Sequence, residues 1–159
     1  RGDPEYKFGM SGSIFLHTFI TSIIKELEKN SDISLTGFNG VMYSVLEDTR
    51  LSQRFSSGQV SISDLLLTST TCGCGIDMLP VTYLNLEKVI SGMIFDMYAL
   101  SYALNKPLGL RVLPVPGARI GDFTSFKHLF FTNMELKRHG SGISIHMLPE
   151  QISDSKFNF

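Results

Sequence analysis

The chain has 159 residues, of which 14 are lysine or arginine and 15 are aspartate or glutamate, and 43% of its residues are hydrophobic. This hydrophobic content excludes a disordered chain, and the net charge of −1 provides no basic surface of the kind that neutralises a nucleic-acid backbone. Charged residues make up 18% of the chain, below the roughly 25% of ordinary soluble domains. We therefore expect one folded domain, part of whose surface another protein segment covers.

The two cysteines, Cys72 and Cys74, are too few for a disulfide-rich secreted protein, and a bridge between residues so close in sequence would be strained. We expect a reducing, cytoplasmic location. Charged residues such as Lys25, Glu87 and Asp96 interrupt the apolar stretches, so no membrane span is expected. The N-terminus has neither a methionine nor a signal sequence, which suggests a piece of a longer protein or one subunit of a split protein.

The N-terminal part of the chain predicts a helix and then a strand. Apolar residues recur at steps of three and four from Ser13 to Asn30, which is typical of a helix with one apolar face. Turn-forming residues follow, and the short apolar run from Ile33 to Phe38 favours a strand. The apolar face of the helix consists of Leu16, Phe19, Ile20, Ile23, Ile24 and Leu27.

Two further helices are predicted before the cysteines. The first spans Val41 to Phe55 and has a polar outer face. The second begins after Ser61, which forms a loose capping box with Asp64, and ends near Thr71. The glycines and the proline of the segment from Thr71 to Pro80 then predict a tight, partly buried loop rather than a regular element.

The C-terminal half predicts a long helix followed by a strand. The helix runs from Asn85, its expected N-cap, to Leu104, and its broad apolar stripe indicates burial on more than one side. The apolar strand from Leu108 to Val115 is typical of a parallel sheet that is covered on both faces. These elements predict an α/β domain over residues 1–135, followed by a polar C-terminal extension over residues 136–159.

The sequence around Cys72 and Cys74 is the strongest chemical feature. Backbone N–H groups exposed by the flanking glycines can lower the pKa of a thiol or bind an oxyanion, although two small buried side chains in a turn give the same pattern. No second pair of cysteine or histidine residues stands at zinc spacing, so we expect no metal site. The glycines also lack the preceding strand of a dinucleotide-binding motif.

Three charged segments are further candidates. Glu47, Asp48 and Arg50 lie close enough to bind a cation or to form a solvated helix face. Arg111 interrupts an apolar strand and needs either an acidic partner or an anionic ligand. The segment from Gly117 to Asp122 follows that strand, where it forms either a ligand-binding loop or a surface turn. Serine-hydrolase and phosphate-loop motifs are absent from the sequence.

The order of several short motifs resembles the C-terminal part of the uncharacterised family called domain of unknown function 711. The resemblance covers roughly residues 11–133. The family has a cysteine at the position of Cys72 but a different residue at the position of Cys74. The motifs include Phe38-Asn39-Gly40-Val41-Met42, Asp64-Leu65-Leu66-Leu67, Cys72-Gly73-Cys74-Gly75-Ile76-Asp77, Leu104-Asn105-Lys106-Pro107-Leu108 and Arg111-Val112-Leu113-Pro114-Val115-Pro116-Gly117.

This resemblance implies a part of a barrel similar to that of pyruvate formate-lyase-type glycyl-radical enzymes, with helices outside parallel strands. Cys72 would then lie on an inner loop. No glycyl-radical motif is present near the C-terminus, so the resemblance does not imply radical chemistry. Part of a barrel leaves open sheet edges, so a companion chain or an N-terminal portion is expected to complete it in a homo- or hetero-oligomer.

Two functions follow as hypotheses. The first is a cysteine-dependent enzyme that acts on a small carboxylate- or carbonyl-bearing metabolite, and the second is a non-catalytic metabolite sensor or structural subunit. The sequence identifies no cofactor, and the expected partners include neither nucleic acid nor membrane. The catalytic candidates are Cys72 and Asp77, and the substrate-binding candidates are Asn39, Gly73, Gly75, Arg111, Gly117 and Asp122.

Overall fold

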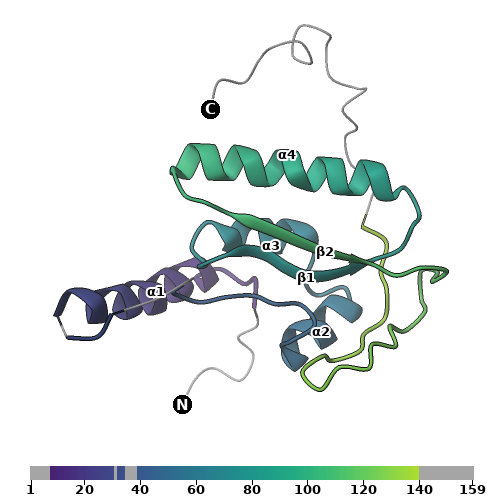
Figure 1. Ribbon diagram of the computed structural model, residues 1–159, viewed down its shortest axis with the longest axis horizontal. Helices are drawn as coiled ribbons and strands as arrows, with labels where there is room; N and C mark the ends of the chain where they lie inside the picture. Colours follow the sequence, from purple (N-terminus) through teal and green to yellow (C-terminus); the bar gives the residue numbers. More distant parts are fainter. Residues whose placement is uncertain (1–7, 31, 35–38, 140–159) are drawn as a thin grey trace, which may run out of the picture.

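The computed structural model describes residues 8–30, 32–34 and 39–139 and shows an α/β arrangement, as predicted (Figure 1). None of the helices in these ranges is long and apolar enough to cross a membrane. In chain order the elements are α1 (Ser13–Asn30), α2 (Thr49–Ser56), α3 (Ile62–Ser69), β1 (Gly75–Val81), α4 (Leu86–Leu104) and β2 (Gly109–Pro114).

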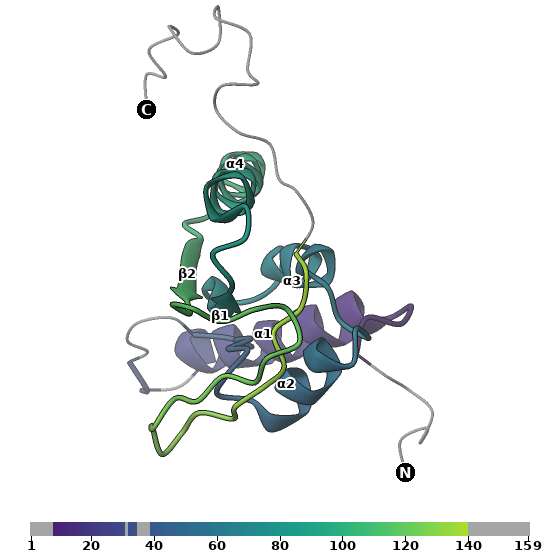
Figure 2. The ribbon, with the colours of Figure 1, turned by 90° about the vertical axis from the view of Figure 1, so that its right-hand side faces the viewer.

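The strands β1 and β2 pair in parallel, and α4 connects them. Figure 2 shows α4 on one side of the strands and α1 and α2 on the other, with α3 beside β1. Gly75 pairs with Gly109 where the strands begin, and Val81 pairs with Pro114 where they end. The described residues thus contain a two-stranded sheet between helices, and the barrel implied by the family resemblance is not seen in them.

The predicted helices α1 and α3 are confirmed. The apolar periodicity gave the bounds of α1 correctly. At the start of α3, the Ser61 hydroxyl accepts the Asp64 N–H at 3.3 Å, and the Asp64 carboxylate accepts the Ser61 N–H at 2.8 Å. Aspartate therefore fills the capping-box position that glutamate or glutamine usually occupies.

The helix predicted from Val41 to Phe55 is wrong in its first half. α2 begins at Thr49, where the Asp48 carboxylate accepts the Leu51 N–H at 2.8 Å and so fixes the N-terminus. The preceding residues run alongside β1 instead, because the Val45 N–H donates to the Asp77 carbonyl at 2.9 Å. A tertiary backbone contact thus replaces the helical hydrogen bonds that the apolar pattern suggested.

The irregular loop predicted from Thr71 to Pro80 is a strand over most of its length, because β1 begins at Gly75. A β-bulge between Ile76 and Leu79 absorbs the irregularity, and Met78 in it has a φ of 52°. Gly75, with a φ of 108°, lies so close to Gly109 that a Cβ atom would come within 2.3 Å of the Gly109 oxygen. The glycine permits the strand pairing rather than preventing it.

The long helix and the last strand are confirmed, but their predicted environments are wrong. Asn85 precedes α4 with a φ of 54° and makes no capping hydrogen bond through its side chain. α4 buries only one side, through Val89, Met93 and Met97, whereas Tyr102 on its outer side is 79% exposed. β2 alternates between exposed and partly buried residues, because helices of the described chain do not cover both of its faces.

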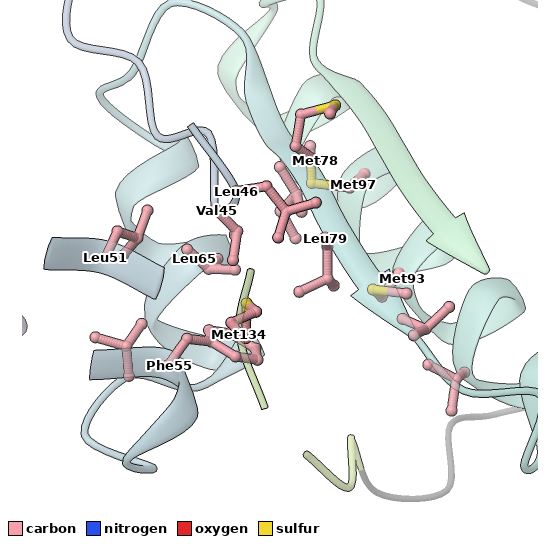
Figure 3. Packing of buried hydrophobic residues seen from close by; sticks show 14 residues of the cluster. Val45, Leu46, Leu51, Phe55, Leu65, Met78, Leu79, Met93, Met97 and Met134 are labelled. Atoms are coloured by element: carbon pink, nitrogen blue, oxygen red, sulfur yellow. The ribbon is translucent and has the colours of Figure 1, made fainter. Parts of the chain in front are cut away.

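The main core lies between β1 and the helices on its two sides. Figure 3 shows the side chains of α2 and α3 on one side of β1 and the methionines of α4 on the other. The buried cluster comprises Val45, Leu46, Leu51, Phe55, Val60, Leu65, Ile76, Met78, Leu79, Val81, Val89, Met93, Met97 and Met134. This core holds β1, and with it the preceding cysteine loop, in a fixed position.

The segment after β2 returns across the core without a helix or a long strand. Phe123 and Glu135 form an isolated antiparallel bridge, and Met134 and Leu136 are buried at 2% and 0% exposure. Residues 140–159, which contain most of the expected C-terminal extension, lie outside the described residues. The expected strand from Ile33 to Phe38 also lies mostly outside them, and its described residues Ile33 and Ser34 are not in a strand.

The apolar face of α1 remains largely exposed within the described chain. Phe19 is 53% exposed, Ile23 is 48% exposed and Leu27 is 48% exposed. Helices of globular proteins normally bury such a face. The low charge content of the chain is therefore reflected in an exposed apolar surface along α1.

Candidate functional site

The loop that carries Cys72 and Cys74 connects α3 to β1, and neighbouring segments fix its backbone. The Gly73 N–H donates to the Val41 carbonyl at 2.9 Å. The Thr21 hydroxyl donates to the Thr71 carbonyl at 3.2 Å and accepts the Val41 N–H at 3.3 Å. Contacts from distant parts of the sequence thus hold the loop on both sides.

The Cys72 sulfur is buried, with 1% of the residue exposed, and its surroundings favour a thiolate. The Cys74 thiol donates a hydrogen bond to it, and the Gly75 N–H donates another at 3.0 Å. The Cys74 hydrogen bond, together with backbone N–H groups and the charge of Lys106, outweighs the effect of burial and lowers the pKa of Cys72 to about 6. The expectation of backbone amides directed at this sulfur agrees with this geometry.

Cys74 is the complementary member of the pair. Its hydrogen bond to Cys72, burial and the negative charges of Cys72 and Asp77 all raise its pKa, although the Tyr43 N–H donates to its sulfur. Since two such close groups titrate as a unit, the pair holds one proton near neutral pH, and Cys72 carries the negative charge. Cys74 lines an open pocket, whereas Cys72 is buried and is not among the residues that line this pocket.

Lys106, which lies between α4 and β2, fixes the same loop from the other side. Its ammonium donates to the Ser69 carbonyl at 3.1 Å and to the Cys72 carbonyl, with the Thr70 carbonyl at 3.5 Å. These are the last carbonyls of α3 and the first of the cysteine loop. A positive charge there stabilises both the C-terminus of α3 and an anionic sulfur nearby.

The pocket beside Cys74 has a volume of about 540 Å³ and contains an ion pair. The Arg111 guanidinium donates to Asp77 through Nε and through Nη2, the latter at 2.7 Å. The apolar strand predicts a buried guanidinium, which is wrong because the Arg111 side chain is 57% exposed, but the expected acidic partner is present and is Asp77. The residues around the pocket are Met42, Glu47, Cys74, Ile76, Asp77, Gly109, Leu110 and Arg111.

The structure brings together only some of the predicted site residues. Gly73 packs against the backbone of Asn39, since a Cβ atom on Gly73 would lie 3.3 Å from the Asn39 oxygen. The turn containing Gly117 and Asp122 follows the far end of β2, whereas the cysteine loop precedes the near end of β1. A strand of this length spans roughly 20 Å, so Gly117 and Asp122 lie far from the cysteine loop.

Asp122 has a local role in its own turn. Its carboxylate accepts the Arg119 N–H at 2.7 Å, and its carbonyl accepts the Leu136 N–H at 2.8 Å. Asp48, for its part, caps α2, and Glu47 alone of the charged group at residues 47–50 lines the pocket. Asp122 and Asp48, which the sequence presented as ligand candidates, thus make local hydrogen bonds that hold a turn and a helix end.

Two residues near the thiols were not found from the sequence. In the sequence, Lys106 belongs only to the motif Leu104-Asn105-Lys106-Pro107-Leu108, and its approach to the cysteine loop depends on how the chain runs from α4 to β2. Tyr43 lay within a predicted helix, whereas the structure directs its N–H to Cys74. The only local signal for Lys106 is its position between the asparagine and the proline that follow a helix. The sequence around Tyr43 contains no such signal.

The amino-acid sequence of the chain matches a family of uncharacterised proteins. Residues 5–135 match the family described as "Uncharacterised ACR (DUF711)". A UPF0210 protein of Pyrobaculum arsenaticum is 32% identical over 124 residues, which is 78% of this chain and 28% of that protein. A UPF0210 protein of Pyrobaculum aerophilum is 29% identical over 135 residues, which is 84% of this chain and 30% of that protein.

A bacterial relative shows the same partial coverage. The UPF0210 protein of Lacticaseibacillus paracasei is 35% identical over 96 residues, covering 60% of this chain and 22% of that protein. The chain therefore spans less than a third of the length of these curated relatives. No solved structure matches the chain.

Proposed function

Because the chain belongs to the DUF711 family of uncharacterised proteins, whose longer members it matches over part of their length, we propose that it contributes the thiol site of an enzyme. The substrate class is a small metabolite with a carboxylate and a carbonyl group. The observation that carries this proposal is the hydrogen-bonded Cys72 and Cys74 pair at the wall of a pocket that also contains Arg111. The catalytic candidates change accordingly, since Cys74 is the sulfur in contact with the pocket.

The thiol pair provides both a nucleophile and a base. As the carbonyl carbon of the substrate approaches, the S–H proton of Cys74 moves along the hydrogen bond to the Cys72 thiolate. The Cys74 sulfur then forms a bond to the carbonyl carbon, and the electron pair of the C=O double bond moves to the oxygen. The negative charge thus passes from Cys72 to the substrate oxygen, on the side of the pocket that holds Arg111.

Arg111 provides the anion selectivity. Asp77 uses Nε and Nη2 of the guanidinium, which leaves other N–H groups of a side chain that is 57% exposed. Planar guanidinium groups bind carboxylates through paired hydrogen bonds. A carboxylate held there places the adjacent carbon atoms of a small metabolite toward Cys74, which lines the same pocket.

We expect this site to prefer an anionic alkylating reagent. Iodoacetate carries a carboxylate and iodoacetamide does not, so their rate ratio, divided by the same ratio for glutathione, measures anion selection near the thiol. The iodoacetate-to-iodoacetamide rate ratio of the protein should be about tenfold above that of glutathione, because roughly 1.4 kcal/mol of carboxylate binding gives this factor. Peptide mapping should locate the label on Cys74.

The variants should move this ratio in opposite directions. Arg111→Met removes the guanidinium and should lower the ratio to that of glutathione or below, whereas Asp77→Asn frees the guanidinium and should raise it. Arg119→Met, at an exposed arginine of the distant turn, is the matched control and should leave the ratio unchanged. A wild-type ratio equal to that of glutathione and insensitive to Arg111→Met would overturn the proposed carboxylate site.

The surrounding architecture belongs to the same proposal. Two parallel strands, helices beside them and a cysteine loop at their amino ends agree with a part of a pyruvate formate-lyase-like barrel, completed by another portion of the protein or by a companion chain. The exposed face of α1 supplies an apolar surface for that portion. The same surface also fits the alternative function, a non-catalytic sensing or structural subunit, in which the thiols would show no anion preference.

A further inference from the structure

We propose that Cys72 and Cys74 are also a reversible redox site, at which a small-molecule disulfide such as glutathione disulfide converts the two thiols into an intraloop disulfide. The inference uses the same two thiols as the proposed function but needs no metabolite substrate. It rests on three features of the loop: the proximity of the sulfurs, the access to one of them and the flexibility of the residue between them.

The two sulfurs already lie close together. Both lie near one carbonyl oxygen, that of Gly75, at 3.7 Å for Cys72 and 3.9 Å for Cys74, and the Cys74 thiol lowers the pKa of Cys72. Disulfide formation requires the two side chains to point toward one another. The shared Gly75 carbonyl therefore places the two sulfurs close to one another in the reduced structure.

Gly73 makes the short ring feasible. A bridge between residues two positions apart strains the intervening backbone, and this strain was the reason to doubt a bridge from the sequence alone. Glycine lacks the Cβ atom that restricts φ and ψ, so Gly73, the one residue between the two cysteines, can adopt backbone angles that other residues could not. A strained bridge is also easier to reduce, which makes the site reversible rather than structural.

The accessibility of the two sulfurs sets the order of the reaction. Cys74 lines the open pocket, so its sulfur, after passing its proton to Cys72, attacks one sulfur of glutathione disulfide. A mixed disulfide forms, and one glutathione thiolate leaves and takes the proton from Cys72. The Cys72 thiolate then attacks the Cys74 sulfur and expels the second glutathione thiolate, which takes a proton from water. The protein loses two electrons, and glutathione disulfide gains them.

Burial protects Cys72 until this second step. With 1% of the residue exposed, Cys72 is not reached directly by a reagent as large as glutathione disulfide. Its low pKa, by contrast, keeps it ready as a thiolate to resolve the mixed disulfide. The buried residue is therefore the resolving cysteine, and the pocket residue is the entry point. The oxidised site would have no thiol with which to attack a carbonyl, so oxidation would switch off the proposed chemistry.

Mass spectrometry of the full chain after incubation with glutathione disulfide tests this inference. Wild-type protein should reach a mass lower by two hydrogen atoms, without retained glutathione, and dithiothreitol should reverse the change. Cys72→Ser should instead accumulate a stable mixed disulfide at Cys74, because no resolving thiol remains. Cys74→Ser should gain glutathione far more slowly, because only the buried Cys72 is left.

Wild-type protein that retains one glutathione on Cys74, as Cys72→Ser does, would overturn the inference. So would equal glutathione uptake by the two serine variants. Neither outcome affects the carboxylate site, which the iodoacetate ratio measures separately. Conversely, a missing anion preference would leave the redox inference standing, since glutathione exchange requires only the two thiols.

Discussion

Replacing Gly75 with alanine is expected to lower the free energy of unfolding by about 4 kcal/mol, through backbone strain and overpacking of the strand pair. The added Cβ atom would lie 2.3 Å from the Gly109 oxygen and 2.7 Å from the Met97 methyl carbon, at a φ of 108° that alanine rarely adopts. The methionine can move aside, but the Gly109 backbone belongs to β2. Chemical denaturation of the 159-residue chain, followed by circular dichroism, measures the effect.

Gly58→Ala provides the matched control for this substitution. Gly58 also has a positive φ, of 73°, but a Cβ atom there would meet no atom within 4 Å. Its cost should be only the conformational penalty of about 1 kcal/mol. The difference between the two variants therefore measures the close approach of β1 and β2. Equal destabilisation of both would contradict the strand pairing described for the start of the sheet.

Lys106→Met is expected to have the second large effect, on stability and on thiol chemistry together. It removes the ammonium that serves carbonyls of Ser69 and Cys72, which should cost about 2 kcal/mol for charge-assisted hydrogen bonds. It also removes a positive charge that lowers the pKa of Cys72. Below the normal thiol pKa, the fraction of thiolate should therefore fall, and glutathione exchange near pH 6 should slow several-fold.

Two lysine variants separate these effects from a general loss of charge. Lys106→Arg keeps the charge and should retain most of the thiolate at pH 6. Lys88→Met, on the exposed surface of α4, should change stability by no more than about 0.5 kcal/mol. If Lys106→Met matched Lys88→Met in both stability and exchange rate, Lys106 would not fix the cysteine loop.

Local sequence signals were sufficient where neighbouring residues determine the conformation. Apolar spacing identified α1 and α4, and the short-range hydrogen bonds of Ser61 and Asp64 identified the start of α3. The parallel strand β2 also followed from its apolar run. The helices and the cap depend on contacts within a few residues of one another, whereas β2 forms its hydrogen bonds with the distant strand β1.

Long-range contacts account for what the sequence did not predict. β1 forms despite Gly75 and Pro80, because a bulge and the pairing with β2 accommodate them. The apolar residues before α2 follow β1 rather than a helix, because Val45 bonds to Asp77. The sequence likewise indicated a functional thiol at Cys72, but only the packed loop shows that Cys72 is buried and that Cys74 faces the pocket.

The ultraviolet absorbance of the thiolate, measured against pH, tests the central claim most directly. The account predicts that one thiolate appears with a midpoint near pH 6, and that the second appears only well above the ordinary range. Because the folded pKa of Cys72 lies below its unfolded value of about 8.5, this thiolate should also stabilise the fold increasingly as pH rises between these values. Cys72→Ser should abolish the first step. Two thiols that titrate together near pH 8.5 in the wild type, with the single remaining thiol of Cys72→Ser titrating at the same pH, would contradict the account.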